Sequence, residues 1–271
     1  MSVYLTNINR PRIVRIQGIR EENPTVKTFV FQDKHCADAK PGQFVMVWIP
    51  GIDEVPMSLS SMNSDGFSSI AVAEVGEATR ALHQGKVGDV LGIRGPYGNG
   101  FALASGRVMI VGGGTGLAPL LPLTESLMKL SAKTHFLAGA KTRDELFFLE
   151  RIKKAVSKVD VTTEDGSYGV KGLVTDLAEK ILKKERFNMI YACGPEKMML
   201  RMLLLAERYN TPFQASLERY VRCGIGICGS CCVGEYRVCK DGPVFSDKQL
   251  GKARSEFGLF KREADGSRVS F

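Results

Sequence analysis

An apolar run, Arg107-Val-Met-Ile-Val111, leads into Gly112-Gly113-Gly114-Thr115-Gly116 and then into a helical pattern from Leu117 to Lys129. A short apolar strand that passes through glycines into a helix is typical of a nucleotide-binding α/β unit. The glycines let a pyrophosphate reach the helix N-terminus without meeting Cβ atoms. The spacing is not Gly-x-Gly-x-x-Gly, so the usual Rossmann fingerprint is absent and a purely structural tight turn is the alternative.

The same alternation of strand and helix continues to Leu217, which predicts a doubly wound parallel α/β domain over residues 105–217, with ligands at the carboxyl ends of its strands. The predicted strands are Arg107–Val111, Thr134–Ala140, Lys158–Thr163, Phe187–Ala192 and Phe213–Leu217. The predicted helices are Leu117–Lys129, Asp144–Ala155, Asp176–Lys184 and Glu196–Tyr209.

Two further strand ends carry residues that suit a nucleotide site. Cys193-Gly194-Pro195 follows one strand and offers a small residue beside a flat ring, or else a buried structural cysteine. Thr163-Glu164-Asp165-Gly166-Ser167 follows another, and its carboxylates either bind ribose hydroxyls or form a turn. The end of the strand at Gly139–Arg143 carries Lys141 and Arg143 and no acid, so it does not exclude a 2′-phosphate.

The N-terminal part, residues 1–104, has a different pattern. Short runs rich in Val, Ile and Phe are separated by turn-forming residues, which predicts an antiparallel β-barrel interrupted by a short helix over Ala78–Gln84. The predicted strands are Arg12–Ile19, Thr25–Gln32, Gln43–Ile49, Ser68–Val75 and Val90–Arg94.

Two short segments of this part have chemical potential. Pro56-Met57-Ser58 follows a predicted strand, and Gly76-Glu77-Ala78-Thr79 opens the short helix. A glycine and a threonine at a helix N-terminus can hold a phosphate through N–H groups and a hydroxyl. A plain turn at Pro56 and a plain helix cap at Thr79 are the alternatives.

The third part, residues 218–271, contains Cys223-Gly-Ile-Gly-Ile-Cys228-Gly-Ser-Cys231 and then Cys239, with the spacing Cys-x4-Cys-x2-Cys-x7-Cys. Three thiolates from one glycine-rich loop and a fourth further along suit a plant-type [2Fe–2S] cluster, whose sulfurs accept backbone N–H groups. Zinc more often takes two Cys-x2-Cys pairs, and disulfides suit small secreted proteins. Cys232 is a rival to Cys231 as a ligand.

Composition limits the remaining possibilities. The chain has 271 residues, 44% hydrophobic residues and a net charge of +8. Its basic residues form no stripe with aromatics, so we expect no nucleic-acid partner. There is neither a signal-peptide pattern nor an apolar run long enough to span a membrane. Seven cysteines without a secretory signal favour the cytoplasm.

From Arg12 to about Phe245 the chain resembles the electron-transfer subunit of dihydroorotate dehydrogenase B, within the ferredoxin–NADP reductase superfamily. The residues that carry the resemblance are Pro-x-Ser in the barrel, Gly-Gly-Gly-Thr-Gly-x-Ala-Pro, Cys-Gly-Pro, the cysteine segment and Val-Cys-x-Asp-Gly-Pro-Val-Phe. Together they imply a flavin-binding barrel, a nicotinamide-nucleotide domain and a small [2Fe–2S] module.

The resemblance also implies residue roles. Pro56, Met57 and Ser58 would lie along the flavin ring of FAD, with Ser58 near N5, and Gly76 and Thr79 would hold the FAD pyrophosphate. Gly112 to Gly116 would face the pyrophosphate of NAD, with Cys193, Gly194 and Pro195 near the nicotinamide. The cluster ligands would be Cys223, Cys228, Cys231 and Cys239.

One position departs from the family. Members usually have Arg immediately before Pro-x-Ser, where its charge meets the flavin phosphate, but this chain has Val55, preceded by Glu54. This departure leaves three alternatives open: FAD binds normally, binds loosely, or binds through another cation such as Arg80 or Arg94.

Hydride transfer moves two electrons and a [2Fe–2S] cluster accepts one, so a flavin belongs between them. Oxidation of dihydroorotate to orotate in pyrimidine biosynthesis would then take place in a partner, which the resemblance identifies as an FMN-containing catalytic subunit in a heterotetramer with two of each chain. A second hypothesis is a subunit of an NAD(P)H–ferredoxin or bifurcating, sulfide dehydrogenase-like reductase. In such relatives an Asp replaces the first cluster ligand, so Cys223 argues against it.

Overall fold

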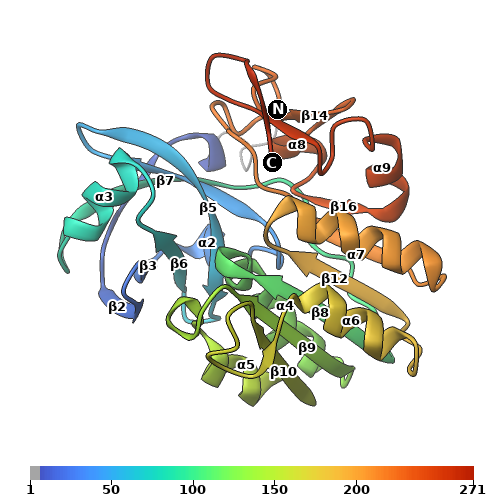
Figure 1. The fold of residues 1–271 in the computed structure, drawn as a ribbon. Helices are drawn as coiled ribbons and strands as arrows, with labels where there is room; N and C mark the ends of the chain where they lie inside the picture. Colours follow the sequence, from blue (N-terminus) through green and yellow to red (C-terminus); the bar gives the residue numbers. More distant parts are fainter. Residues whose placement is uncertain (1–6) are drawn as a thin grey trace.

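The structure, a computed structural model, describes residues 7–271. Seven strands form its N-terminal part: β1 (Arg12–Arg15), β2 (Gly18–Asn23), β3 (Val26–Gln32), β4 (Phe44–Ile49), β5 (Asp53–Met62), β6 (Phe67–Ala73) and β7 (Val90–Tyr97). They form one antiparallel sheet in the order β1-β7-β4-β5-β6-β3-β2 (Figure 1). The predicted antiparallel architecture is confirmed.

The two edges of this sheet are joined by consecutive residues. Between β1 and β2, the N–H of Ile16 donates to Asp89 O at 2.9 Å, on the β7 side, and the N–H of Gln17 donates to Val30 O at 2.7 Å, on the β3 side. The sheet therefore curves back on itself around a core of side chains that include Phe29, Phe31, Val45, Ile70 and Ile93. The prediction of one strand over Arg12–Ile19 was wrong, because the chain changes partner strand at Ile16 and Gln17.

Strand β5 is the main element of this sheet that the sequence did not predict. It has ten residues, and Pro56-Met57-Ser58 lies within it rather than in a turn. Pro56 pairs with Met46 and Ser58 with Phe44 on β4. This part also contains helices α2 (Lys34–Ala37) and α3 (Glu77–Gln84), and α3 confirms the predicted short helix to within one residue at its start.

A second sheet forms the middle of the chain. Its strands are β8 (Arg107–Gly113), β9 (Lys133–Ala140), β10 (Lys158–Thr163), β11 (Val170–Lys171), β12 (Met189–Cys193), β13 (Phe213–Ser216) and β16 (Val244–Ser246), in the order β11-β10-β9-β8-β12-β13-β16. The first six run parallel, and β16 runs antiparallel to β13. The chain winds outward from β8 to β9 and β10 and then returns to β12, so the strand order changes direction between β8 and β12.

The helices of this domain are α4 (Leu117–Lys129), α5 (Leu149–Ala155), α6 (Val174–Leu182) and α7 (Glu196–Arg208). Helix α4 begins and ends at the predicted residues. The prediction of a helix that starts at Asp144 was wrong: a short 3-10 turn, Arg143–Glu145, is followed by extended Leu146, and α5 begins after Phe148, whose φ is 61°. A left-handed residue interrupts helical hydrogen bonding, so one continuous helix cannot form there.

Hydrogen bonds attach the connection between the two sheets to the second one. The hydroxyl of the fully buried Tyr191 on β12 donates to Ala102 O at 2.9 Å and accepts from the Ala104 N–H at 2.8 Å. Gln214 on β13 bonds both the N–H and the carbonyl of Ala102. These contacts fix the position of the barrel against the α/β sheet.

The C-terminal part lies above both sheets in Figure 1, in orange and red. It contains β14 (Cys232–Val233), β15 (Tyr236–Arg237), α8 (Val238–Asp241), α9 (Asp247–Lys252), β17 (Phe260–Arg262) and β18 (Arg268–Ser270), and its strand β16 extends the second sheet. The segment after Ser246 is packed on the rest of the molecule, because Leu250, Ala253 and Phe257 are buried in the main core. The domain boundaries at 104 and 217 stay predictions.

Among residues 7–271, no helix is both long enough and apolar enough to cross a membrane.

Replacing Tyr191 with Phe tests the attachment of the connection. The change leaves the Ala102 carbonyl with one fewer donor and the Ala104 N–H without its acceptor. We therefore expect the free energy of unfolding to fall by about 1–2 kcal/mol in urea titrations. Tyr168→Phe, on a half-exposed surface loop, is the matched control and should change it by less than about 0.5 kcal/mol. Equal effects of both variants would contradict this role of Tyr191.

Candidate functional site

The predicted nucleotide segments meet where the strand order changes direction. Gly112 and Gly113 end β8, and Cys193 ends the neighbouring strand β12. The chain segments touch through backbone atoms: a Cβ on Gly116 would lie 2.3 Å from Cys193 O, and a Cβ on Gly194 would lie 2.8 Å from Gly113 O. Only glycine permits this approach, so the two strand ends form one rigid floor at the switch point.

The glycines of the run differ in what they do. A Cβ on Gly112 would lie 2.6 Å from the Leu117 side chain, so this residue lets α4 pack on its own strand rather than facing a ligand. Gly114 has φ +53° and open space where a Cβ would be. It precedes the start of α4, whose first N–H groups have no intrahelical acceptor. Gly114 and Thr115 are therefore the residues of the run best placed to face a pyrophosphate.

A cavity of about 390 Å³ lies between this floor and the barrel. It brings together most of the predicted site residues: Pro56, Met57, Ser58, Thr79, Gly113, Gly114, Thr115, Gly116, Cys193, Gly194 and Pro195. Gly76 lies next to it, since its neighbour Val75 lines the cavity, and Gly112 lies behind the lining in β8. Burial raises the pKa of the Cys193 thiol to about 12, and the Glu218 carboxylate acts in the same direction. The thiol therefore stays neutral at this floor.

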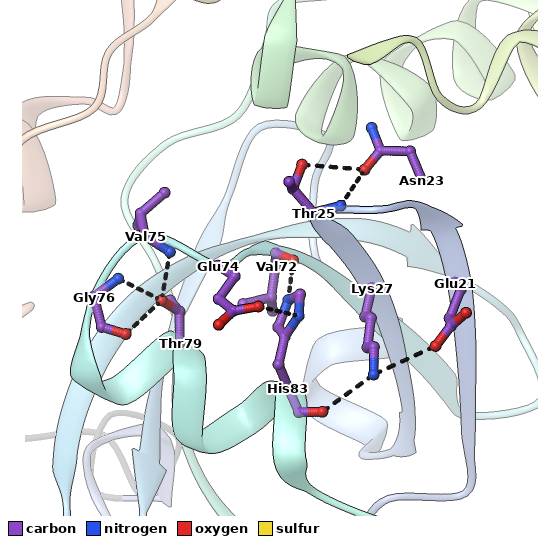
Figure 2. Close-up of polar contacts among 10 residues, drawn as sticks. All are labelled: Glu21, Asn23, Thr25, Lys27, Val72, Glu74, Val75, Gly76, Thr79 and His83. Atoms are coloured by element: carbon purple, nitrogen blue, oxygen red, sulfur yellow. Dashed lines mark hydrogen bonds and ion pairs between the residues drawn. The ribbon is translucent and has the colours of Figure 1, made fainter. Parts of the chain in front are cut away.

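The start of α3 is closed by the Thr79 side chain (Figure 2). Its hydroxyl oxygen accepts from the N–H groups of Val75 at 2.9 Å and Gly76 at 2.8 Å, and donates to Gly76 O at 3.0 Å. The hydroxyl is thus committed to the backbone, which supports the cap that the sequence left as an alternative. A phosphate at this helix would meet the N–H groups of its first turn instead.

Neither of the two expected substitute cations is free beside Val55. Arg94 bonds the Glu54 carboxylate at 2.7 Å through Nε and also donates to Cys223 O at 3.3 Å. Arg80 is exposed on α3 and does not line the cavities that border Val55. Arg94 therefore attaches the barrel to the cysteine loop.

The cysteine loop has the backbone geometry that a cluster needs. Gly224, Gly226 and Gly229 have φ values of +73°, +79° and +76°, which residues with a Cβ rarely adopt. They allow N–H groups to turn toward sulfur: the Gly226 N–H donates to Cys239 Sγ at 3.2 Å, and the Ile227 N–H donates to Cys223 Sγ at 3.4 Å. Such N–H groups stabilise sulfur that carries negative charge.

This arrangement shifts the pKa values of the cysteine thiols. Burial acts to raise the pKa of Cys223, but the N–H groups of Cys228, Ile227 and Ile225 outweigh it and lower the pKa to about 6. The hydrogen bond with Cys239 lowers the pKa of Cys231 to about 7 and raises that of Cys239, because the two thiols share a proton. A metal ligand must be a thiolate, so these low values suit ligation.

The relation of Cys232 to the other cysteines is different. It begins β14, and burial and the charge of Cys231 raise the pKa of its thiol. Its other charged neighbours include Arg262, Arg237 and Glu256. Within the described part of the chain, no three His, Cys, Asp or Glu side chains surround a single metal-ion position. The ligand assignment of Cys223, Cys228, Cys231 and Cys239 stays a prediction, and N–H to sulfur contacts support it at Cys223, Cys231 and Cys239.

The sequence did not reveal a second, larger cavity of about 940 Å³ that adjoins the first. Pro56, Met57, Val75 and Thr79 line both, so the cleft is continuous. Its other walls include Glu196 and Arg219, which form a buried ion pair, and the C-terminal residues Lys261, Arg262, Glu263 and Phe271. The sequence signal for this cavity is the position of Glu196 directly after Cys193-Gly194-Pro195.

At the end of β10, the two acidic residues Glu164 and Asp165 differ in their hydrogen bonds. Asp165 accepts from the N–H and the hydroxyl of Ser167 at 2.9 and 2.7 Å, so it forms a turn. Glu164 is exposed beside it. The guanidinium of Arg143 lies 5.8 Å from the ring centre of Tyr168.

Two family models match the chain. Residues 110–202 match the oxidoreductase NAD-binding domain, and residues 218–251 match the iron–sulfur cluster binding domain of dihydroorotate dehydrogenase B. The fold also resembles solved structures. One, titled "Insights into flavin-based electron bifurcation via the NADH-dependent reduced ferredoxin-NADP oxidoreductase structure", has a TM-score of 0.81 at 28% identity and covers 90% of this chain and 94% of that one. The flavohem-like FAD/NAD binding domain of nitric oxide dioxygenase from Vibrio cholerae has a TM-score of 0.66 at 22% identity, covers 74% of this chain and 94% of that one, and shows the fold alone.

Curated relatives match nearly the whole chain. A protein of Methanocaldococcus jannaschii named "Probable dihydroorotate dehydrogenase B (NAD(+)), electron transfer subunit" is 47% identical over 266 residues, which cover 97% of this chain and 100% of the relative. A protein of the same name from Pyrococcus horikoshii is 45% identical over 255 residues, which cover 94% of this chain and 97% of the relative. The chain therefore belongs to the family of dihydroorotate dehydrogenase B electron transfer subunits.

Proposed function

We propose that this chain passes electrons between a partner flavoprotein, which oxidises dihydroorotate to orotate, and NAD, through a [2Fe–2S] cluster and FAD. The observation that carries the proposal is the direct contact of the three parts. The cleft brings the β5 segment Pro56–Ser58 to the nucleotide floor at Gly113–Gly116. The cysteine loop packs on the same barrel wall, since a Cβ on Gly224 would lie 3.1 Å from the side chains of Met46 and Tyr97.

The residues present fit the two redox groups. A bound flavin exchanges two electrons as hydride with a nicotinamide and single electrons with an iron–sulfur cluster. Phe44, Met57 and Ala73 offer an apolar wall for a flat ring, and Ser58 adds a hydroxyl. The N–H groups that point at Cys223 and Cys239 stabilise the charge of a cluster. The chain needs no general base for this task, because it holds and orients groups and excludes water.

We assign NAD as the nicotinamide nucleotide. The curated relatives carry NAD(+) in their names. Glu164, exposed at the end of β10, offers a carboxylate for ribose hydroxyls, and a carboxylate disfavours a 2′-phosphate. The Arg143 guanidinium lies against the Tyr168 ring, so this cation already has a partner within the chain.

The partner is a catalytic subunit, as the name "electron transfer subunit" of the relatives indicates. We further propose that it contains FMN and that two copies of each chain assemble. The cluster loop offers a docking face: Ile227, Ile225 and Tyr220 are exposed by 77%, 39% and 41%, around the exposed Cys228. Apolar side chains around a redox centre suit a protein partner that must approach it closely. A cytoplasmic location stays a prediction.

A ferredoxin-linked or bifurcating reductase subunit is the second candidate. The 28% identical structure with a TM-score of 0.81, whose title names electron bifurcation, favours it. The relatives at 45–47% identity favour the first candidate. Cys223, with its lowered pKa and its N–H donor, is equipped as a thiolate ligand.

The complex itself tests the proposal. When the chain is purified together with its native partners, the complex should contain a flavoprotein chain. This complex should reduce NAD when dihydroorotate is added. Ile227→Asp should release that partner while keeping FAD and iron, because it places a charge on the docking face. Val87→Asp, at a 62% exposed position on the barrel, is the matched control and should not release the partner. A partner set that reduces ferredoxin and ignores dihydroorotate would favour the second candidate.

Cysteine variants test the ligand set. Cys228→Ser and Cys239→Ser should each reduce iron from about two per chain to near zero and abolish the visible absorbance of the cluster, while FAD remains bound. Cys232→Ser should retain both irons, because the Cys-x2-Cys spacing after Cys228 favours Cys231 as the ligand. Iron and acid-labile sulfide analysis measures both results. Full iron in Cys228→Ser would remove this residue from the set.

Substitutions at two glycines distinguish a role in nucleotide binding from a role in packing. A methyl group at Gly114 enters open space above α4, so Gly114→Ala should weaken NADH binding, with only about 1 kcal/mol lost in stability from its left-handed φ. A methyl group at Gly116 meets Cys193 O, so Gly116→Ala should cost about 1–3 kcal/mol in stability. NADH titration and urea unfolding provide the two measurements. Unchanged NADH affinity in Gly114→Ala would refute the assigned pyrophosphate position.

A further inference from the structure

The C-terminal hairpin, β17 and β18, is anchored at both ends on one buried ion pair. At its start, the Gly258 N–H donates to Glu196 Oε1 at 2.7 Å. At its end, the Phe271 ring lies 5.6 Å from the guanidinium carbon of Arg219, which is the ion-pair partner of Glu196. A Cβ on Gly258 would lie 2.5 Å from the Leu200 side chain, so the hairpin starts directly on α7. Its position over the cleft is therefore fixed.

This hairpin forms one wall of the 940 Å³ cavity through Lys261, Arg262 and Glu263. Another wall is the β5 segment from Asp53 to Met57, and a third is Val75 and Thr79 at the start of α3. In Figure 1 the end of the chain, marked C, lies above the junction of the barrel with the orange helix α7. Residues separated by about two hundred positions in the sequence thus line one space, which is large enough for part of a dinucleotide.

Charged side chains of both signs line this cavity, and the cations among them are Lys197, Arg219, Arg222, Lys261 and Arg262. Glu54 bonds Arg94, Glu196 bonds Arg219, and Glu263 lies 3.0 Å from Lys261, while Asp53 and Glu218 complete the acidic lining. Arg262 donates through Nη2 to Glu256 at 2.8 Å. Its side chain is 29% exposed and lines the cavity, where a guanidinium N–H can donate to a phosphate oxygen.

We propose that Arg262, with Lys261 at the rim, is the cationic contact for the diphosphate of FAD. The inference rests on the proposed function, which places FAD in this cleft. Val75 and Thr79, at the start of α3, line the same cavity, and the N–H groups of a helix N-terminus favour an anion nearby. Position 55, where a barrel cation would stand, is Val55, and it lines this cavity too. The tail thus supplies the charge that β5 does not.

Binding of FAD and of riboflavin to the full-length chain, stripped of flavin, tests the inference. Riboflavin has the same ring but no phosphate, so a phosphate contact changes only the affinity for FAD. Arg262→Gln should weaken FAD binding about tenfold, measured by flavin fluorescence, and should leave riboflavin affinity unchanged. The FAD affinity of Arg262→Gln should also depend less on salt than that of the unmodified chain.

Two variants are the controls. Arg268→Gln removes a cation from the same hairpin, where it packs on the Phe260 ring and does not line the cavity, so FAD affinity should not change. Glu256→Gln breaks the ion pair of Arg262 but keeps the cation, so FAD affinity should be retained. Equal loss in Glu256→Gln and Arg262→Gln would show a structural role and overturn the inference.

Other outcomes are equally decisive. Equal FAD affinity of Arg262→Gln and the unmodified chain would refute the inference and leave the proposed function intact. Parallel loss of riboflavin and FAD binding would also refute it, because the effect would then lie at the ring. An unmodified chain that binds riboflavin and FAD equally well would refute any phosphate contact. If it binds neither flavin, the proposed function itself fails.

Discussion

The ion pair between Glu196 and Arg219 connects all three parts of the site. Both side chains are at most 4% exposed, and Arg219 Nη2 donates to Glu196 Oε1 at 2.7 Å. Glu196 is the first residue of α7, Arg219 leads into the cysteine loop, and both contact the C-terminal hairpin. Removing one partner of such a buried pair typically costs about 3–5 kcal/mol, because the other charge is left unpaired. The nucleotide floor, the cluster module and the tail are therefore held as one unit.

This pair also explains why the floor is rigid. Cys193-Gly194-Pro195 directly precedes Glu196, so the ion pair holds one end of that segment. Its other contact is the backbone approach to Gly113 and Gly116 across the switch point. A segment that is fixed on both sides can position a nicotinamide ring without reorganising, which is what hydride transfer requires of the protein. Packing and charge pairing provide this positioning, and hydride transfer needs no acid or base from the chain.

Local signals in the sequence predicted much of this structure, and long-range contacts explain what they missed. Helix α4 and strand β10 have the predicted bounds, because strand and helix periodicities change sharply at the glycine run and at Lys158. Strand β5 was missed because a proline within a run favours a turn, and only pairing with β4 reveals the strand. The packing of Phe257 and the cavity that Arg262 lines together with β5 depend on folding of the whole chain, which no short segment of sequence reveals.

Strand β5 takes part in attaching the cysteine loop to the barrel. Glu54 holds Arg94 in an ion pair, and Arg94 also donates to Cys223 O, so this pair attaches the cysteine loop to the barrel. Val55 points to the other face of β5 and brings no charge to the cleft, whereas Lys261 and Arg262 of the tail line the second cavity. Because the tail is anchored on the Glu196–Arg219 pair, its cations are placed as precisely as those of a strand would be.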